Sequence, residues 1–247
     1  MPDPIAPEPV ASEPSAPKGL AGRVVGVVTS PRATYHEVVV RPRWLGVLLS
    51  VMLVSTTMST AFLASEVGRQ ALLDQQVRTL ESFGRQVTEV QYRQFQRMAP
   101  YAAAFGAAGQ VLGLPLVVLI ASGIAYALFA AVLGGQATFT QTFAVVAHSF
   151  VVQGLRALFS TPLNYARGAM SSPTNLAVLL PFLDEGSFDE RLLGSIDLFV
   201  LWWLISLAIG LGVLFKRRTA PIATGLLITY AAIALVVAAL GTAFSGS

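Results

Sequence analysis

The 247-residue chain is 54% hydrophobic and only 12% charged, and its formal net charge is +3. A soluble domain usually carries about 25% charged residues, so this composition excludes an ordinary soluble protein and indicates an integral membrane protein. The absence of Cys excludes disulfides, thiolate catalysis and Cys-ligated metals, and the scattered basic residues argue against a nucleic-acid partner.

The N-terminal residues 1–19 are expected to form a disordered cytoplasmic tail, because they are rich in Pro, Ala, Ser and Glu and show no apolar periodicity. They lack the basic start and apolar centre of a signal peptide, so the first span is expected to act as an uncleaved signal anchor. Residues 20–28 are apolar but too short to span, and we expect them at the membrane surface. Ser30 and Pro31 predict a short helix that ends before Pro42.

Five long apolar runs follow, and each is about as long as a membrane is thick. Because about 20 residues of helix cross the hydrocarbon, these runs predict five transmembrane helices. The predicted spans cover approximately residues 44–64, 103–133, 142–161, 196–215 and 221–243. The predicted fold class is therefore all-α, a polytopic membrane helix bundle with five transmembrane helices, in one membrane domain over residues 20–247.

Residues 66–98 lie between the first two spans and are too polar to cross a membrane. Their apolar residues fall on one helical stripe. Three acid–Arg pairs at i,i+4 spacing also favour helix: Asp74–Arg78, Glu81–Arg85 and Glu89–Arg93. We expect one or two amphipathic extracytoplasmic helices, broken at Gly84, that pack on the end of the bundle or at the interface, with partner binding as the alternative.

Small residues in the spans predict where helices approach closely. Gly109 and Gly113 have the GxxxG spacing that is common at contacts between membrane helices. Pro115 removes one backbone hydrogen bond, so a kink is expected there. Gly210, in the fourth span, is also predicted to be a packing residue.

The charges near the spans predict the orientation of the chain. Basic residues dominate before the first span and in the turn Lys216–Arg218, whereas acids balance or exceed bases over residues 66–98 and 164–195. Positively charged loops stay in the cytoplasm, so five spans with a cytoplasmic N-terminus and an extracytoplasmic C-terminus fit every segment.

The third predicted span is the most polar one, and its polar residues share one arc of a helical wheel: Gln141, His148, Ser149, Gln153, Arg156 and Ser160. Such groups must face the bundle or a wet cavity. One interpretation is a pocket that handles protons or a solute. The other, which we favour, is hydrogen bonding between helices, with Arg156 reaching the outer interface or an acid such as Asp197.

No recognisable catalytic or metal-binding pattern is present. The two His residues are not part of an HExxH motif or an Asp/His cluster. The acids near residue 187 lack calcium-loop spacing, and Ser187 with Glu190 forms a capping box that predicts a helix start. No catalytic triad or phosphate loop is recognisable, so we predict no enzymatic activity, no cofactor and no metal site.

Four stretches occur in an order and spacing that carry a family resemblance. They are Thr29–Tyr35 with Arg41–Trp44, Gly134–Phe139, Ser195–Trp203 running on to Gly210, and the basic turn Lys216–Arg218 with Pro221. Over roughly Leu20–Phe244 the chain resembles the Yip family of Ypt/Rab-interacting-protein type membrane domains. The Cys-free, Ala- and Arg-rich composition is typical of a bacterial-type member, in the inner membrane.

The resemblance implies a five-span bundle with a cytoplasmic N-terminus, in agreement with the loop charges. It implies binding of prenylated Rab-type GTPases in vesicle trafficking for the eukaryotic relatives alone, and it supplies no catalytic residues. We therefore expect a non-enzymatic scaffold or adaptor that organises membrane proteins or lipids, and that can form an oligomer. The alternative is a transporter or channel subunit that uses the polar third span.

Overall fold

A computed structural model describes residues 19–82, 84–184 and 186–245 of the chain. The tail expected over residues 1–19 falls almost entirely outside these described residues. Within them every regular element is a helix, which agrees with the predicted all-α class. The N-terminal half contains α1 (Leu20–Thr29), α2 (Pro31–Val40), α3 (Leu45–Ala64), α4 (Glu66–Glu81), α5 (Glu89–Met98), η1 (Ala99–Tyr101), α6 (Ala102–Tyr126) and η2 (Ala127–Val132).

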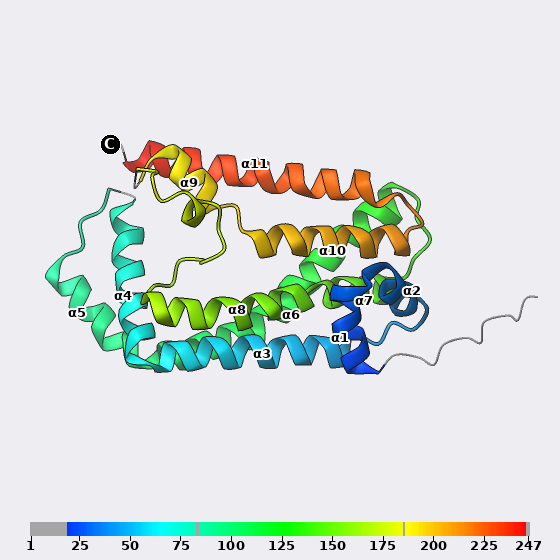
Figure 1. Ribbon diagram of the computed structural model, residues 1–247, viewed down its shortest axis with the longest axis horizontal. Helices are drawn as coiled ribbons and strands as arrows, with labels where there is room; N and C mark the ends of the chain where they lie inside the picture. Colours follow the sequence, from blue (N-terminus) through cyan, green and yellow to red (C-terminus); the bar gives the residue numbers. More distant parts are fainter. Residues whose placement is uncertain (1–18, 83, 185, 246–247) are drawn as a thin grey trace, which may run out of the picture.

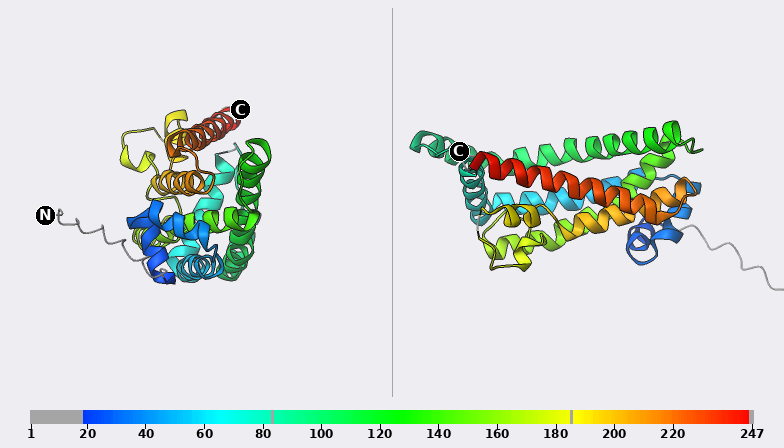
Figure 2. Two further views of the ribbon diagram at one scale, coloured as in Figure 1. Left: turned by 90° about the vertical axis from the view of Figure 1, so that its right-hand side faces the viewer. Right: turned by 90° about the horizontal axis from the view of Figure 1, so that it is seen from above.

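The C-terminal half contains α7 (Phe139–Ser149), α8 (Val151–Arg167), η3 (Ala177–Leu179), α9 (Phe188–Gly194), α10 (Leu198–Leu214) and α11 (Thr219–Ser245). The long helices lie side by side along the molecule (Figure 1). The helices α4, α5 and α9 and the end of α11 gather at one end. At the other end lie α1, α2 and the start of α11, as the view from above also shows (Figure 2).

Four helical stretches are long and apolar enough to cross a membrane: Leu45–Ala64, Glu89–Val132, Phe139–Arg167 and Thr219–Ala243. The structure thus supports a polytopic membrane bundle and contains four stretches of this length, one fewer than the five predicted spans. The fourth predicted span, residues 196–215, forms only the 17-residue α10. It is shorter because Asp197 caps its first turn and the chain leaves the helix at Phe215, before Lys216 takes a φ of 52°.

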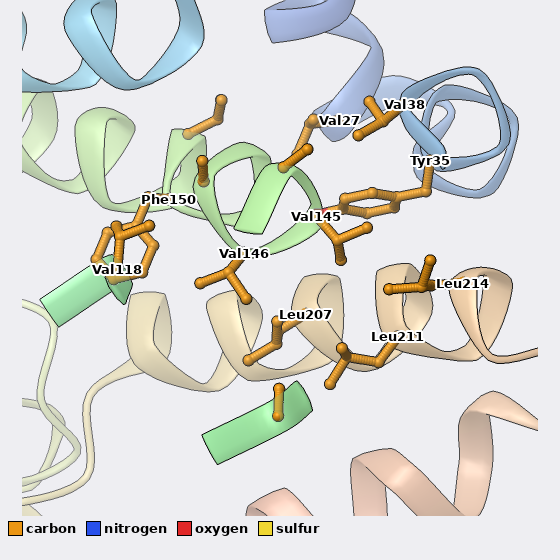
Figure 3. Packing of buried hydrophobic residues seen from close by; sticks show 14 of the residues in the cluster. Val27, Tyr35, Val38, Val118, Val145, Val146, Phe150, Leu207, Leu211 and Leu214 are labelled. Carbon is orange, nitrogen blue, oxygen red and sulfur yellow. The ribbon is translucent and has the colours of Figure 1, made fainter. Parts of the chain in front are cut away.

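The stretch α7–α8 is the central helix of the bundle. Of its most apolar 18-residue window, 61% is buried, whereas the corresponding share is 17% for α11 and for the stretch that contains α6. It contacts α3, α6, α10 and α2. Figure 3 shows Val145 and Val146 of this helix against Leu207 and Leu211 of α10, with Tyr35 and Val38 of α2 beside them. The outer helices therefore expose a larger share of their apolar side chains than the central helix does.

The helical pair α1–α2 packs on the bundle rather than lying free on its surface. The α2 helix contacts α10 and α7, and Val27 and Val38 are almost completely buried. An ion pair joins the two helices, with Arg23 Nη2 lying 3.3 Å from Glu37 Oε1. The α2 helix starts at Pro31 and ends before Pro42 as predicted, but the Ser30 side chain makes no capping hydrogen bond.

The segment over residues 66–98 forms two helices, as expected, with Gly84 at a φ of 71° in the connection between them. Of the three predicted i,i+4 pairs, Glu89–Arg93 is present, at 4.0 Å. Asp74 instead accepts a hydrogen bond from Gln70. In isolation such exposed contacts contribute little to stability, so the N-cap at Ser65, the capping box at Thr88 and the connection geometry set these helix ends.

The glycines divide into two groups. A Cβ on Gly210 would lie 2.5 Å from Val145 Cγ1 and 3.0 Å from Tyr35 Cε1, so Gly210 allows α10 to approach α7 and α2. A Cβ on Gly109 or Gly113 would meet no atom within 4 Å. No described residue of this chain therefore packs against the GxxxG pair, and the close helix packing predicted there stays a prediction for a partner outside the chain. The close approach of α6 to α3 occurs at Gly106, whose Cβ would lie 2.8 Å from Leu63 Cδ1.

Substituting Ala at two glycines will distinguish the effect of packing on stability from the effect of helix propensity. We expect Gly210→Ala to lower the free energy of unfolding by about 1–3 kcal/mol, because Val145 and Tyr35 must move. Gly113→Ala is the matched control, since it gains the same helix propensity and meets open space. Thermal unfolding of both variants in detergent measures the difference, and equal stability of the two would contradict the close approach at Gly210.

Candidate functional site

The predicted polar arc lies on α7–α8, the most buried helix of the bundle. The structure places its residues at three separate levels along this helix. Gln141 lies in the first turn of α7, His148 near the end of α7, and Arg156 within α8. The sequence grouped them because they share one helical arc, but their hydrogen-bond partners differ at each level.

Gln141 closes the first turn of α7 and connects it to α2. Its Oε1 accepts a hydrogen bond from the Thr138 backbone N at 2.9 Å, as part of a capping box. Its Nε2 donates to the Val39 carbonyl at 3.0 Å. Both ends of the amide are therefore used, which gives Gln141 a structural function at the junction of two helices.

His148 is completely buried in the middle of the bundle. Its Nδ1 lies 2.7 Å from the Ala144 carbonyl, a contact that places the ring proton on Nδ1. Nε2 has no hydrogen-bond partner among the described residues. The neighbouring Ser149 donates to the Val146 carbonyl at 2.7 Å and accepts from Trp203 Nε1 of α10 at 3.0 Å. This level thus joins α7 to α10.

At the third level Arg156 meets Asp197, the residue that precedes α10. The distance from Arg156 Nη2 to Asp197 Oδ2 is 3.2 Å. The carboxylate is almost fully buried, whereas the Arg156 side chain is about one-third exposed. The pairing that the sequence analysis favoured is therefore present in the structure. Gln153, one turn away, is half-buried, and its backbone N donates to the Phe150 carbonyl at 2.9 Å, whereas its side chain makes no hydrogen bond to another described residue.

Asp197 has several further partners besides Arg156. Its Oδ1 accepts from the backbone N of Phe199 at 2.8 Å, so it caps α10. Its Oδ2 accepts hydrogen bonds from the hydroxyls of Ser172 and Thr174, the latter at 2.9 Å. A charge buried on this scale is stable only when several donors surround it. We call Arg156, Asp197, Ser172 and Thr174 the Asp197 cluster.

The backbone around the Asp197 cluster links it to α11. The Asp197 backbone N donates to the Tyr230 hydroxyl at 3.0 Å, and that hydroxyl donates to the Ser195 carbonyl at 2.8 Å. Asn175 and Asp197 also form an isolated antiparallel bridge. The cluster therefore connects α8, the connection after it, α10 and α11 at one point.

Sequence reasoning missed a second polar contact, between α2 and α10. The hydroxyls of Tyr35 and Ser206 are 2.8 Å apart, and both side chains are buried. Burial raises the pKa of the Tyr35 phenol well above its usual range, so this group stays neutral and remains a hydrogen-bond donor. The available signal was Gly210, one helical turn from Ser206, which leaves room for the Tyr35 ring.

The three best-formed cavities among the described residues do not include the polar arc. None of the three described cavities is lined by His148, Gln153 or Arg156. The cavity nearest to α8 is apolar, small at about 80 Å³, and lined by α3 and α8 residues such as Val51 and Gly154. Among the described residues, no three His, Asp or Glu side chains lie close enough to hold one metal ion.

Comparison with known proteins identifies a family. The model of the Yip1 domain family matches residues 25–241, which confirms the resemblance drawn from the sequence. No curated protein and no solved structure matches the chain. The match begins inside α1 and ends inside α11, so it includes both the Asp197 cluster and the Tyr35–Ser206 contact.

A double-mutant cycle will test the ion pair of the Asp197 cluster. Arg156→Ala and Asp197→Asn should each lower the free energy of unfolding by about 1–3 kcal/mol, because each leaves a partner without its charge. The double variant should lose less than the sum, by about 0.5–3 kcal/mol. Melting in detergent measures all three, and strictly additive losses would contradict a direct interaction. Arg93→Ala, which removes an exposed pair, is the control, with an expected loss within about 0.5 kcal/mol.

Proposed function

Because the chain belongs to the Yip1 domain family of membrane proteins, we propose that it is a non-enzymatic scaffold or adaptor that organises other membrane proteins or lipids. The observation that carries the proposal is how the polar side chains of the central helix are used. Gln141, Ser149 and Arg156 each bond another helix or the residue that caps one, and no described cavity reaches them. Groups engaged in this way hold helices together rather than bind a solute.

We also propose that α10 crosses the membrane as a fifth span. Seventeen residues of helix extend about 26 Å, which is near the lower limit for a transmembrane helix. Figure 1 shows α10 beside α11 and parallel to the central helix, and α10 packs on α11 over much of its length. The polar cap at Asp197 and the basic turn at Lys216 flank its two ends. Such flanks are typical of a short span between two interfaces.

The proposed orientation follows from the charges at the two ends of the molecule. Basic residues that include Arg32, Arg43 and Lys216–Arg218 lie at the end that holds α1, α2 and the start of α11. The opposite end holds α4, α5 and α9, in which acids and bases are mixed. By the positive-inside rule the first end is cytoplasmic. We place the protein in a bacterial inner membrane, with the C-terminus outside.

The proposed partners are lipids and other membrane proteins, including further copies of this chain. The lipid-facing sides of α6 and α11 carry many exposed apolar side chains, for example Leu112, Ile120 and Val236. Gly109 and Gly113 lie in open space on α6, so another helix can approach them only from outside this chain. The binding of GTPases is not part of the proposal.

Cysteine labelling will test the topology, since the chain has no native Cys. With five spans, an impermeant thiol reagent should label Ser82→Cys and Ser187→Cys in intact cells. It should label Arg218→Cys only after the cells are opened. Labelling of Ser187→Cys and Arg218→Cys from the same side would contradict a crossing by α10. Background labelling is controlled with the unmodified chain.

A paired stability and flux assay will test scaffold against transporter. We expect His148→Ala and Arg156→Ala to lower the melting temperature in detergent, because their contacts are internal. Proteoliposomes with the unmodified protein should pass protons and small ions no faster than empty liposomes. Unchanged melting together with altered flux would overturn the scaffold proposal and favour a transporter. Arg78→Ala, an exposed residue of α4, is the control for both assays.

A further inference from the structure

A cavity of about 800 Å³ lies between η2 and α11, at the basic end of the molecule. Its walls are apolar and include Leu128, Phe129, Ile222 and Leu226. It remains open because α6 packs mainly on α3 and α7, whereas α11 packs on α10 and α9. This volume lies within the range of sites that hold small molecules, and its position at the side of the bundle makes it accessible from the lipid.

Three consecutive cations also line the cavity, namely Lys216, Arg217 and Arg218. Arg217 Nη2 donates to the Leu133 carbonyl at 3.0 Å, which ties the α10–α11 turn to the connection after η2. The other two side chains are exposed and make no hydrogen bond or ion pair with another described residue. No Asp or Glu lines the cavity. The site therefore offers two uncompensated positive charges beside an apolar slot.

We propose that this cavity binds an anionic phospholipid of the surrounding membrane. The phosphate lies against Lys216 and Arg218, and one acyl chain extends along α11 between η2 and Ile222. The charge of the headgroup complements the two free cations, and the acyl chain matches the apolar walls. A zwitterionic lipid carries an additional positive group that these cations repel. Basic pockets beside transmembrane helices attract anionic headgroups for this reason. The inference needs only the membrane location and holds for a scaffold or a transporter.

Two kinds of variant probe the two halves of the site. Lys216→Gln with Arg218→Gln removes the two free charges and leaves the Arg217 contact intact. Gly225 lines the slot, and a Cβ there meets no atom within 4 Å, so Gly225→Leu places an apolar side chain in the space that the acyl chain would occupy. The matched control is Arg78→Gln with Arg85→Gln, which removes two exposed charges at the opposite end.

Native mass spectrometry of the detergent-purified full chain will measure the binding of phosphatidylglycerol and of phosphatidylcholine with identical acyl chains. We expect saturable binding of phosphatidylglycerol at one site, with phosphatidylcholine clearly weaker. The Lys216→Gln/Arg218→Gln variant should bind phosphatidylglycerol roughly 10- to 30-fold more weakly. Gly225→Leu should lose the bound lipid while its melting temperature without lipid is unchanged. The control variant should bind like the unmodified protein.

Three outcomes would overturn the proposal. Equal affinity for the two lipids would show that Lys216 and Arg218 do not select an anionic headgroup. An equal loss in the control variant would show that general surface charge, not this site, holds the lipid. Competition by free glycerol phosphate at the concentrations at which the lipid binds, with Gly225→Leu unaffected, would mean that the turn binds a phosphate without an acyl chain.

Discussion

The arrangement of the C-terminal half depends on the contacts of the buried Asp197 carboxylate. It caps α10, pairs with Arg156 of α8 and accepts hydrogen bonds from Ser172 and Thr174, while its backbone N donates to Tyr230 of α11. A buried charge is stable only when an opposite charge and hydrogen-bond donors lie beside it, so these groups must pack around the Asp197 carboxylate. One residue therefore fixes both the starting point of α10 and the positions of its neighbours.

The proposed function rests on how the polar side chains of the central helix are bonded. Polar groups are costly inside a bilayer unless they are paired or solvated. In α7–α8 they connect to α2 through Gln141, to α10 through Ser149 and to the Asp197 cluster through Arg156. None of the three cavities described above includes these groups, and the one of about 800 Å³ lies at the basic turn. These features favour a protein that acts through its outer surface over one that moves a solute through its centre.

Much of this could be predicted from the sequence. Apolar runs of membrane length identified the α-helical class, since a helix satisfies its own backbone in lipid whatever surrounds it. The break at Gly84 and the end of α2 before Pro42 also followed from local backbone preferences. The Arg156–Asp197 pair was foreseen because an intramembrane cation requires a nearby acid or an interface. The order of short motifs indicated the Yip1 domain family.

Other features depend on contacts between residues far apart in the chain, and only the tertiary structure decided them. No described residue of this chain packs against Gly109 or Gly113 of the GxxxG pair. The close helix approaches occur at Gly106 and Gly210 instead. The depth at which Tyr35 reaches Ser206, and the slot between η2 and α11, also depend on how whole helices pack. By itself the sequence determined which segments are helical and which are apolar. Which faces of those helices meet was decided by the fit of side chains across the bundle, because spacing within one helix carries no information about its neighbour.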